Sequence, residues 1–254
     1  MPDNVFSIEE TSDAFRFASH WWRSIVGAVD DDVWDRPGLG EWTVRELVAH
    51  ADRAYRTVID YLVGDTVDPT PIATAAEYFR IVLAEETPHA HIAARAKREA
   101  AEHPDWVATT DELALHCEKL IVDTPGDATC HLMVGEMPLD QYLATRVLEL
   151  VVHGMDLADA IGLEVNPPPA SAEVTLRVLL DLAGDAGPGT AIRALVGRPP
   201  SGAGHVLQDG IARAHAVLLV HRRQVVHVDE HERERLAQPA RPVERLLDAA
   251  LQVV

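Results

Sequence analysis

The sequence predicts a mainly all-α protein, an antiparallel helical bundle with long loops and a small C-terminal appendage. Two observations lead to this class. Apolar residues recur at helical spacing through most of residues 7–184, and helix-start signals precede the first two of these segments. Strand-like alternation is scarce, and its best example, AVLLVHRRQVVHV at 216–228, suggests a pair of strands. An α+β structure is therefore one option for the appendage.

The first helix is expected over residues 7–29. Ser7 and Glu10 have the spacing of a capping box, in which a hydroxyl and a carboxylate satisfy free backbone N–H groups at a helix start. The residues that follow are amphipathic, as in a helix that packs one face against a core. Their apolar stripe consists of Phe15, Ala18, Trp22 and Ile25.

The second helix has a clearer start, in the stretch EWTVRELVAH. Thr43 fits the N-cap, and Glu46 lies three residues later, as a capping box requires. Trp42 and Leu47 fit the two positions of a hydrophobic staple across the same helix start. Apolar residues then continue at helical spacing, so one unbroken helix is expected to about Leu62.

The remaining elements follow from the same periodicity. Further helices are expected at 74–86, 90–102, 108–122 and 171–184, and one around the stretch RVLELVVHG that ends at about Ala160. Pro88 separates the first two of these helices, because proline cannot continue a helix. The segment TPGDATCHLMVGEMPLDQ (124–141) is typical of a loop or a short hairpin.

Charge and turn content suggest two parts, a helical bundle over residues 1–200 and an appendage over 201–254. The connection between them is the turn-rich stretch GRPPSGAG. Acidic and basic residues balance in the appendage, so the bundle carries the whole formal net charge of −19. The two parts therefore differ in electrostatic character.

Several functional classes are excluded by composition. A net charge of −19 would be repelled by nucleic acid and by anionic membranes, so neither is expected as a partner. No apolar run approaches the roughly 20 residues of a membrane span, and the stretch MPDNVFSIEE lacks the features of an export signal. Two cysteines in a chain of this length indicate reduced thiols rather than a disulfide framework. We expect a cytoplasmic protein, monomeric or homodimeric.

The stretch RVLELVVHG carries an unusual polar stripe. At about 100° per residue, Arg146, Glu149, His153 and Asp156 fall within a sector of roughly 80°, while the rest of the helix surface is apolar. Such a helix is expected to be buried nearly all round, and a buried carboxylate must be paired or bind a metal. The stripe is therefore either an internal ion pair of structural role or part of a metal site.

His50 is the candidate for a third metal ligand. It lies at the edge of the apolar stripe of the second helix, where a histidine can also be a boundary residue with local hydrogen bonds. If the two helices face each other, His50 would converge with Glu149 and His153, as in the metal sites of helical bundles. Two imidazoles and a carboxylate suit a catalytic Zn²⁺ and also Fe²⁺. The sequence contains no HExxH motif, so nothing in it indicates a zinc peptidase.

Three stretches resemble the mycothiol-dependent maleylpyruvate isomerase family, which has a DinB-like four-helix bundle. They are GEWTVRELVAHADR (40–53), GEMPLDQYLATRVLELVVHGMDLADAIG (135–162) and AIRALVGRP (191–199), and the resemblance covers roughly residues 10–200. Members hold a divalent metal, normally zinc, through a histidine after the W-T-V helix start and a Glu-x-x-x-His pair on a later helix. The resemblance implies zinc at His50, Glu149 and His153.

The resemblance also implies a chemistry. Family members use a low-molecular-weight thiol, mycothiol, as cofactor or co-substrate, and a metal-activated thiolate adds to an electrophilic small molecule. The expected activity is that of an isomerase, with a detoxifying mycothiol S-transferase, a metal-dependent hydrolase and a non-catalytic metal-binding protein as alternatives. Arg146 and Asp156 are expected to orient the ligands, or else to form a simple ion pair. Family isomerases also use a C-terminal domain, to which residues 201–254 show no clear match.

Overall fold

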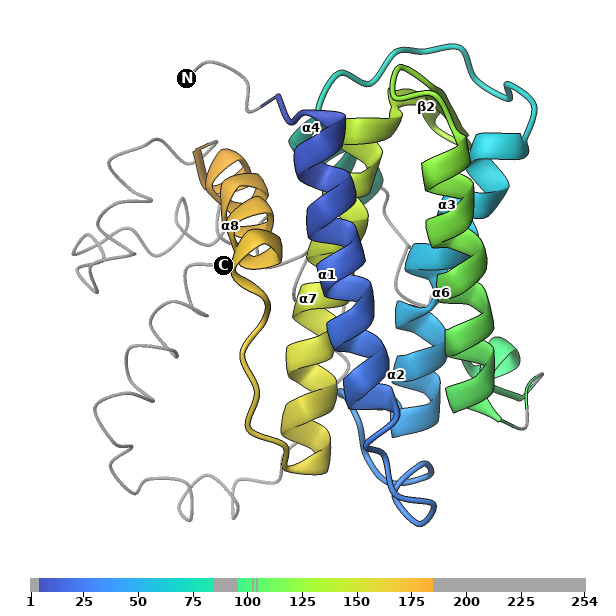
Figure 1. Ribbon diagram of the computed structural model, residues 1–254, viewed down its shortest axis with the longest axis vertical. Coiled ribbons are helices and arrows are strands. Elements are labelled where there is room, and N and C mark those ends of the chain that lie inside the picture. The colour runs from blue at the N-terminus through green and yellow to red at the C-terminus, as the bar shows by residue number, and fades with distance from the viewer. Residues whose placement is uncertain (1–4, 85–95, 102, 104, 185–254) are drawn as a thin grey trace. The chain divides into compact units, whose positions relative to one another are not determined.

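The computed structural model describes residues 5–84, 96–101, 103 and 105–184 (Figure 1). Within this part of the chain the protein is mainly helical with one two-stranded sheet, which confirms the predicted fold class. The elements are α1 (Ile8–Val26), α2 (Val44–Ala51), α3 (Arg53–Val63), α4 (Ala75–Leu83), α6 (Trp106–Asp123), β1 (Thr129–Leu132), β2 (Gly135–Pro138), α7 (Leu139–Ile161) and α8 (Pro169–Gly184).

Both predicted helix starts are confirmed, but only the first half of the capping box predicted at Ser7 and Glu10 forms, and the Glu10 carboxylate pairs with Arg177. The Ser7 hydroxyl accepts a hydrogen bond from the backbone N–H of Glu10 at 3.2 Å, so α1 begins where its cap predicts. At α2 both halves of the capping box form. The backbone N–H of Glu46 donates to Thr43 Oγ1 at 3.3 Å, and the N–H of Thr43 donates to Glu46 Oε2 at 2.9 Å. The start of α2 is therefore fixed by local interactions.

The prediction of one unbroken helix to about Leu62 is wrong, because the helix is interrupted at Asp52, between α2 and α3. The Asp52 side chain is fully buried and accepts hydrogen bonds from Trp22 Nε1 at 2.8 Å and from Thr110 Oγ1 at 2.6 Å. These donors lie on α1 and α6, so a buried carboxylate joins three helices at the junction. The apolar spacing continues across the break and gives no sign of it.

Helix α7 is the central element of this part of the chain and contacts α1, α2, α3 and α4. Figure 1 shows it running alongside α1. The two helices approach closely at Gly154, where an added Cβ would lie 2.2 Å from Trp21 Cζ3. Among the residues of α7, Asp159 alone is exposed, which confirms that this helix is buried nearly all round. It ends at Gly162 in the left-handed conformation, with φ of 72°.

The predicted hairpin is also present. Strands β1 and β2 pair antiparallel, with Cys130 opposite Met137. The backbone N–H of Ile72 donates to the carbonyl of Glu136 at 2.8 Å, which ties the hairpin to the segment before α4. Gly135, with φ of 147°, allows this close approach, because a Cβ there would lie 2.4 Å from the Thr70 carbonyl oxygen.

The chain divides into two compact units, residues 1–178 and 179–254. In the second unit, residues 179–184 at the end of α8 are described. The predicted boundary near residue 200 and the predicted strands at 216–228 lie outside the described residues. Of the predicted helix at 90–102, residues 96–101 are described and are helical. None of the described helices has the length and apolar character of a membrane span.

Candidate metal centre

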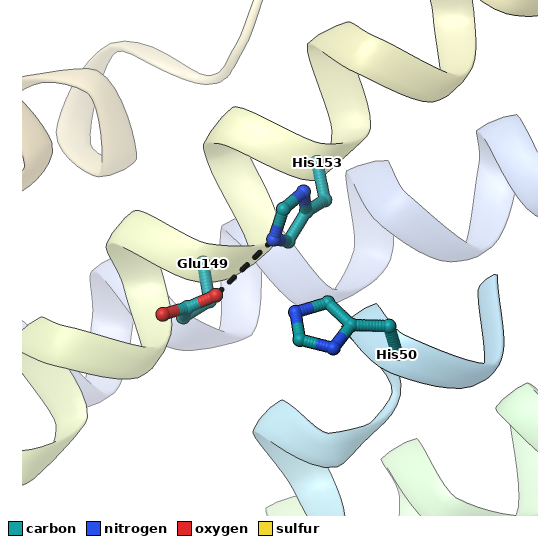
Figure 2. Close-up of side chains that lie close together, drawn as sticks. All are labelled: His50, Glu149 and His153. Carbon is teal, nitrogen blue, oxygen red and sulfur yellow. Dashed lines mark ion pairs between the residues drawn. The ribbon is translucent and has the colours of Figure 1, made fainter. Parts of the chain in front are cut away.

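Three side chains from two separate helices converge inside the helical unit. His50 on α2 and Glu149 and His153 on α7 each place one potential ligand atom within 4.8 Å of the others. Figure 2 shows the two imidazole rings and the carboxylate pointing toward a common point between the helices. The structure thus brings together the three residues predicted as metal ligands, although about 100 positions separate His50 from the other two.

His50 is held between two aromatic neighbours. Its side chain is buried, and its ring lies 4.7 Å from the Trp42 ring and 5.1 Å from the His153 ring, measured between centroids. The His153 ring stands nearly perpendicular to it, at 83°. His50 is therefore an interior residue rather than a boundary one, and its burial follows from the packing of α2 on α7.

His153 contacts a carboxylate through each ring nitrogen. Nε2 lies 3.2 Å from Glu149 Oε2, and Nδ1 lies 3.3 Å from Asp156 Oδ2. Both carboxylates are on the same helix, one turn before and one turn after the histidine. Asp156 is thus placed to orient the imidazole from outside the cluster, which is the arrangement common around metal-bound histidines.

This environment favours the charged imidazole while no metal is bound. Burial by itself lowers the pKa of His153, but hydrogen bonds to Asp156 and Glu149 outweigh burial and raise the pKa to about 9. A ligating imidazole must be neutral, so metal binding would release this proton. A divalent cation would then take over the role of the proton as the counter-charge to Glu149.

Arg146 lies one turn before Glu149, but the two do not form an ion pair. Its side chain is 6% exposed, and Nε donates a hydrogen bond to Thr145 Oγ1 at 3.0 Å. The guanidinium carbon lies 4.9 Å from the centre of the Tyr142 ring and 5.7 Å from that of Tyr78. Among the described residues the guanidinium forms no close ion pair, but the charge of Glu149 acts on it through space, so the role of Arg146 stays a prediction.

Sequence reasoning missed the aromatic surroundings of the site. The sequence pattern predicts a hydrophobic staple for Trp42 at the helix start, and nothing in its spacing indicates that it packs on His50. Tyr78 comes from α4, far from Arg146 in the sequence. No local signal could have found either contact, because each depends on how two helices pack.

The donor set fits a divalent transition metal. Two buried imidazoles and one partly exposed carboxylate converge here, and together they would leave at least one coordination position for a small ligand. The protein's own thiols are free and buried elsewhere in the fold, and burial raises the pKa of Cys130 to about 12. A thiolate at this site would therefore have to come from a bound small molecule.

Comparison with known proteins gives one family match. The family model for the mycothiol maleylpyruvate isomerase N-terminal domain matches residues 15–158, more than half of the chain. The matched segment contains His50, Glu149 and His153 together with Trp42 and Arg146. Searches of curated proteins and of solved structures return no match.

Proposed function

The chain belongs to the family of the mycothiol maleylpyruvate isomerase N-terminal domain, and on that premise we propose that it is a zinc-dependent enzyme with a DinB-like four-helix bundle. It uses mycothiol as cofactor or co-substrate and adds the thiolate to an electrophilic small molecule. The observation that supports this most directly is the convergence of His50, Glu149 and His153 within 4.8 Å.

Each residue of the site has a distinct role in this proposal. His50, Glu149 and His153 hold the zinc ion, and Glu149 offsets part of its charge. When bound, the ion lowers the pKa of a thiol that coordinates it, so that the nucleophilic thiolate exists at neutral pH. With the metal bound, Asp156 would accept a hydrogen bond from the Nδ1–H of His153, which would leave the Nε2 lone pair for the ion.

The surroundings shield the two imidazoles from solvent, while the Glu149 side chain stays partly exposed. The Trp42 ring packs on the His50 ring, and most residues of α7, the helix that carries Glu149 and His153, are buried. In an isomerase, the thiol would add to a cis double bond and leave again after rotation about the resulting single bond. In an S-transferase, the adduct would gain a proton and be released. The same residues serve both reactions.

The first test is elemental analysis of the purified protein beside two variants. We expect about one equivalent of zinc in the wild type and none in His153→Ala, with the far-UV circular dichroism of both unchanged. His131→Ala is the matched control. His131 Nδ1 also lies beside a carboxylate, 3.0 Å from Glu136 Oε1, but on the hairpin away from the cluster. This variant should keep its zinc.

Turnover then separates the alternatives. The zinc-loaded protein is mixed with an electrophile that has a cis double bond, such as diethyl maleate, with and without mycothiol. Product formation that requires both zinc and mycothiol supports the proposal. Hydrolytic activity without any thiol would replace it by a metal-dependent hydrolase. A wild type that binds no zinc after exposure to the metal would overturn the metalloenzyme assignment.

A further inference from the structure

We propose that Tyr78 is a catalytic hydrogen-bond donor beside the candidate metal centre. Its hydroxyl donates to the substrate oxygen that becomes negatively charged when the thiolate adds. This inference rests on the proposed function and assigns a residue to the charge that the reaction creates. Its grounds are the place of the phenol against α7, the direction of its hydrogen bond with Arg146 and its partial exposure.

Tyr78 reaches the stripe of α7 that carries the metal cluster from a different helix, α4. Its ring centre lies 5.7 Å from the guanidinium carbon of Arg146 and 6.0 Å from the ring centre of Tyr142. Arg146 is one turn before Glu149, which belongs to the cluster. The charge of Glu149 acts on both Tyr78 and Arg146 through space. The phenol therefore lies near the reacting groups without being one of the metal ligands.

The hydrogen bond between Tyr78 and Arg146 leaves the phenol proton for another partner. A guanidinium has N–H donors and no acceptor, so Arg146 donates and the phenol oxygen accepts. None of the residues that the structure describes accepts a hydrogen bond from the Tyr78 hydroxyl. Because Arg146 draws electron density toward the phenol oxygen, its hydrogen bond also strengthens the donor on the other side of that oxygen.

The phenol keeps its proton at neutral pH. Burial raises the pKa of Tyr78 above its usual value, and the positive charge of Arg146 opposes this effect without cancelling it. A phenol that stays protonated donates a hydrogen bond and does not act as a base. Tyr78 is therefore suited to stabilise a negative charge that appears beside it.

Partial exposure separates Tyr78 from the other tyrosines near Arg146. Tyr142 also contacts the guanidinium but is fully buried, so a small molecule cannot reach its hydroxyl. Tyr61 is partly exposed and its ring centre lies 5.7 Å from that of Tyr142, but its described contacts include no hydrogen bond with Arg146. Tyr78 combines both properties, since it is partly exposed and held by Arg146.

The reaction creates the charge that such a donor stabilises. When a thiolate adds to a double bond conjugated with a carbonyl group, the sulfur–carbon bond forms and the π electron pair moves onto the carbonyl oxygen. A fixed donor beside this oxygen binds the enolate more tightly than the neutral substrate and so lowers the barrier. Tyr78 keeps its own proton throughout. In an isomerase the electron pair returns and the thiolate leaves, and in an S-transferase a proton from solvent reaches the carbon.

The test compares two variants that each lose one hydroxyl group. Zinc-loaded wild type, Tyr78→Phe and Tyr61→Phe are assayed with mycothiol and diethyl maleate. In Tyr78→Phe, kcat should fall about 100-fold with KM nearly unchanged, since the lost hydrogen bond matters in the transition state and not in the ground state. Tyr61→Phe removes the same atom from a neighbouring ring and should keep the kcat of the wild type.

Two further readouts separate this role from a structural one. Zinc content and the calorimetric affinity for mycothiol should be equal in Tyr78→Phe and the wild type, because neither involves the enolate. Alkylation of mycothiol by iodoacetamide should also proceed at the wild-type rate in Tyr78→Phe. In that reaction the sulfur displaces iodide, and no substrate oxygen becomes negative.

Several results would overturn the inference. They are an unchanged kcat with diethyl maleate in Tyr78→Phe, a rise in KM alone, or an equal loss of rate with diethyl maleate and iodoacetamide. A folded Tyr78→Phe that has lost zinc or its affinity for mycothiol would make Tyr78 a support for the site. A wild type that binds no zinc, or that adds no thiol when loaded with zinc, contradicts the proposed function and the role of Tyr78 with it.

Discussion

Substitution of Gly154 by alanine tests the packing that positions His153, its neighbour on α7. An alanine Cβ at this position would lie 2.2 Å from Trp21 Cζ3 and 2.7 Å from Cη2, which is far inside van der Waals contact. Trp21 is buried, so its ring has little room to withdraw. Helix α1 or the Trp21 ring must therefore shift.

The expected magnitude comes from two opposing effects. Overpacking a core costs typically 1–3 kcal/mol, and the short distance places this site at about 3 kcal/mol. Alanine is favoured over glycine in a helix by about 1 kcal/mol. Gly154→Ala should therefore lower the free energy of unfolding by about 2 kcal/mol, as measured by urea unfolding followed by circular dichroism.

A double-mutant cycle isolates the steric cause. In a Trp21→Leu background the ring is absent, so Gly154→Ala should be neutral or stabilising, with a coupling energy of about 2–3 kcal/mol between the two positions. The reasoning is refuted if Gly154→Ala stabilises the protein that has Trp21, or if its effect is the same in both backgrounds.

Three further predictions concern the site and the helix that carries His50. Thr43→Ala removes the cap of α2 and should cost about 1 kcal/mol in urea unfolding, and an unchanged midpoint would contradict the capping argument. In metal-free protein the pKa of His153 is raised to about 9, so its stabilising contribution is complete below the unfolded value of 6.5 and is lost as pH rises through 9. In the presence of a chelator, the free energy of unfolding should fall by about 3 kcal/mol between these two pH values, which is followed as a lower thermal midpoint. His153→Ala should remove this pH dependence. Asp156→Asn should weaken zinc binding roughly 10- to 100-fold in competition with a chromophoric chelator, and an unchanged affinity would show that Asp156 does not support His153.

Local patterns explain which parts of the structure were predictable. The caps at Ser7 and Thr43 involve residues three positions apart, so their geometry is contained in short stretches of sequence. The polar stripe with Glu149 and His153 follows from helical periodicity alone. His50 was a candidate from its place on the second helix, and the resemblance to a family supported it, because its ligand partners lie on another helix.

The features that were not predictable depend on tertiary contacts. The break at Asp52 reflects hydrogen bonds from Trp22 and Thr110, which come from helices before and after it in the chain. The aromatic contacts of Arg146 reflect the packing of α4 on α7. Periodicity describes one helix at a time, so it cannot report which partner a buried polar group finds.

The short helix α2 has a consequence for how tightly a metal would be bound. Its start is fixed by the capping box at Thr43, and its end is fixed at Asp52 by donors from Trp22 and Thr110. The position of His50 is thus fixed by interactions at both ends of α2, while Glu149 and His153 lie one turn apart on the single helix α7. If they bind a metal, the three side chains would form a preorganised tridentate site, comparable to a macrocycle rather than an open-chain chelator. Most of the conformational entropy of these side chains is lost when the protein folds. Metal binding would therefore cost less entropy, and the ion would be bound more tightly, than at a site that orders only when the ion binds.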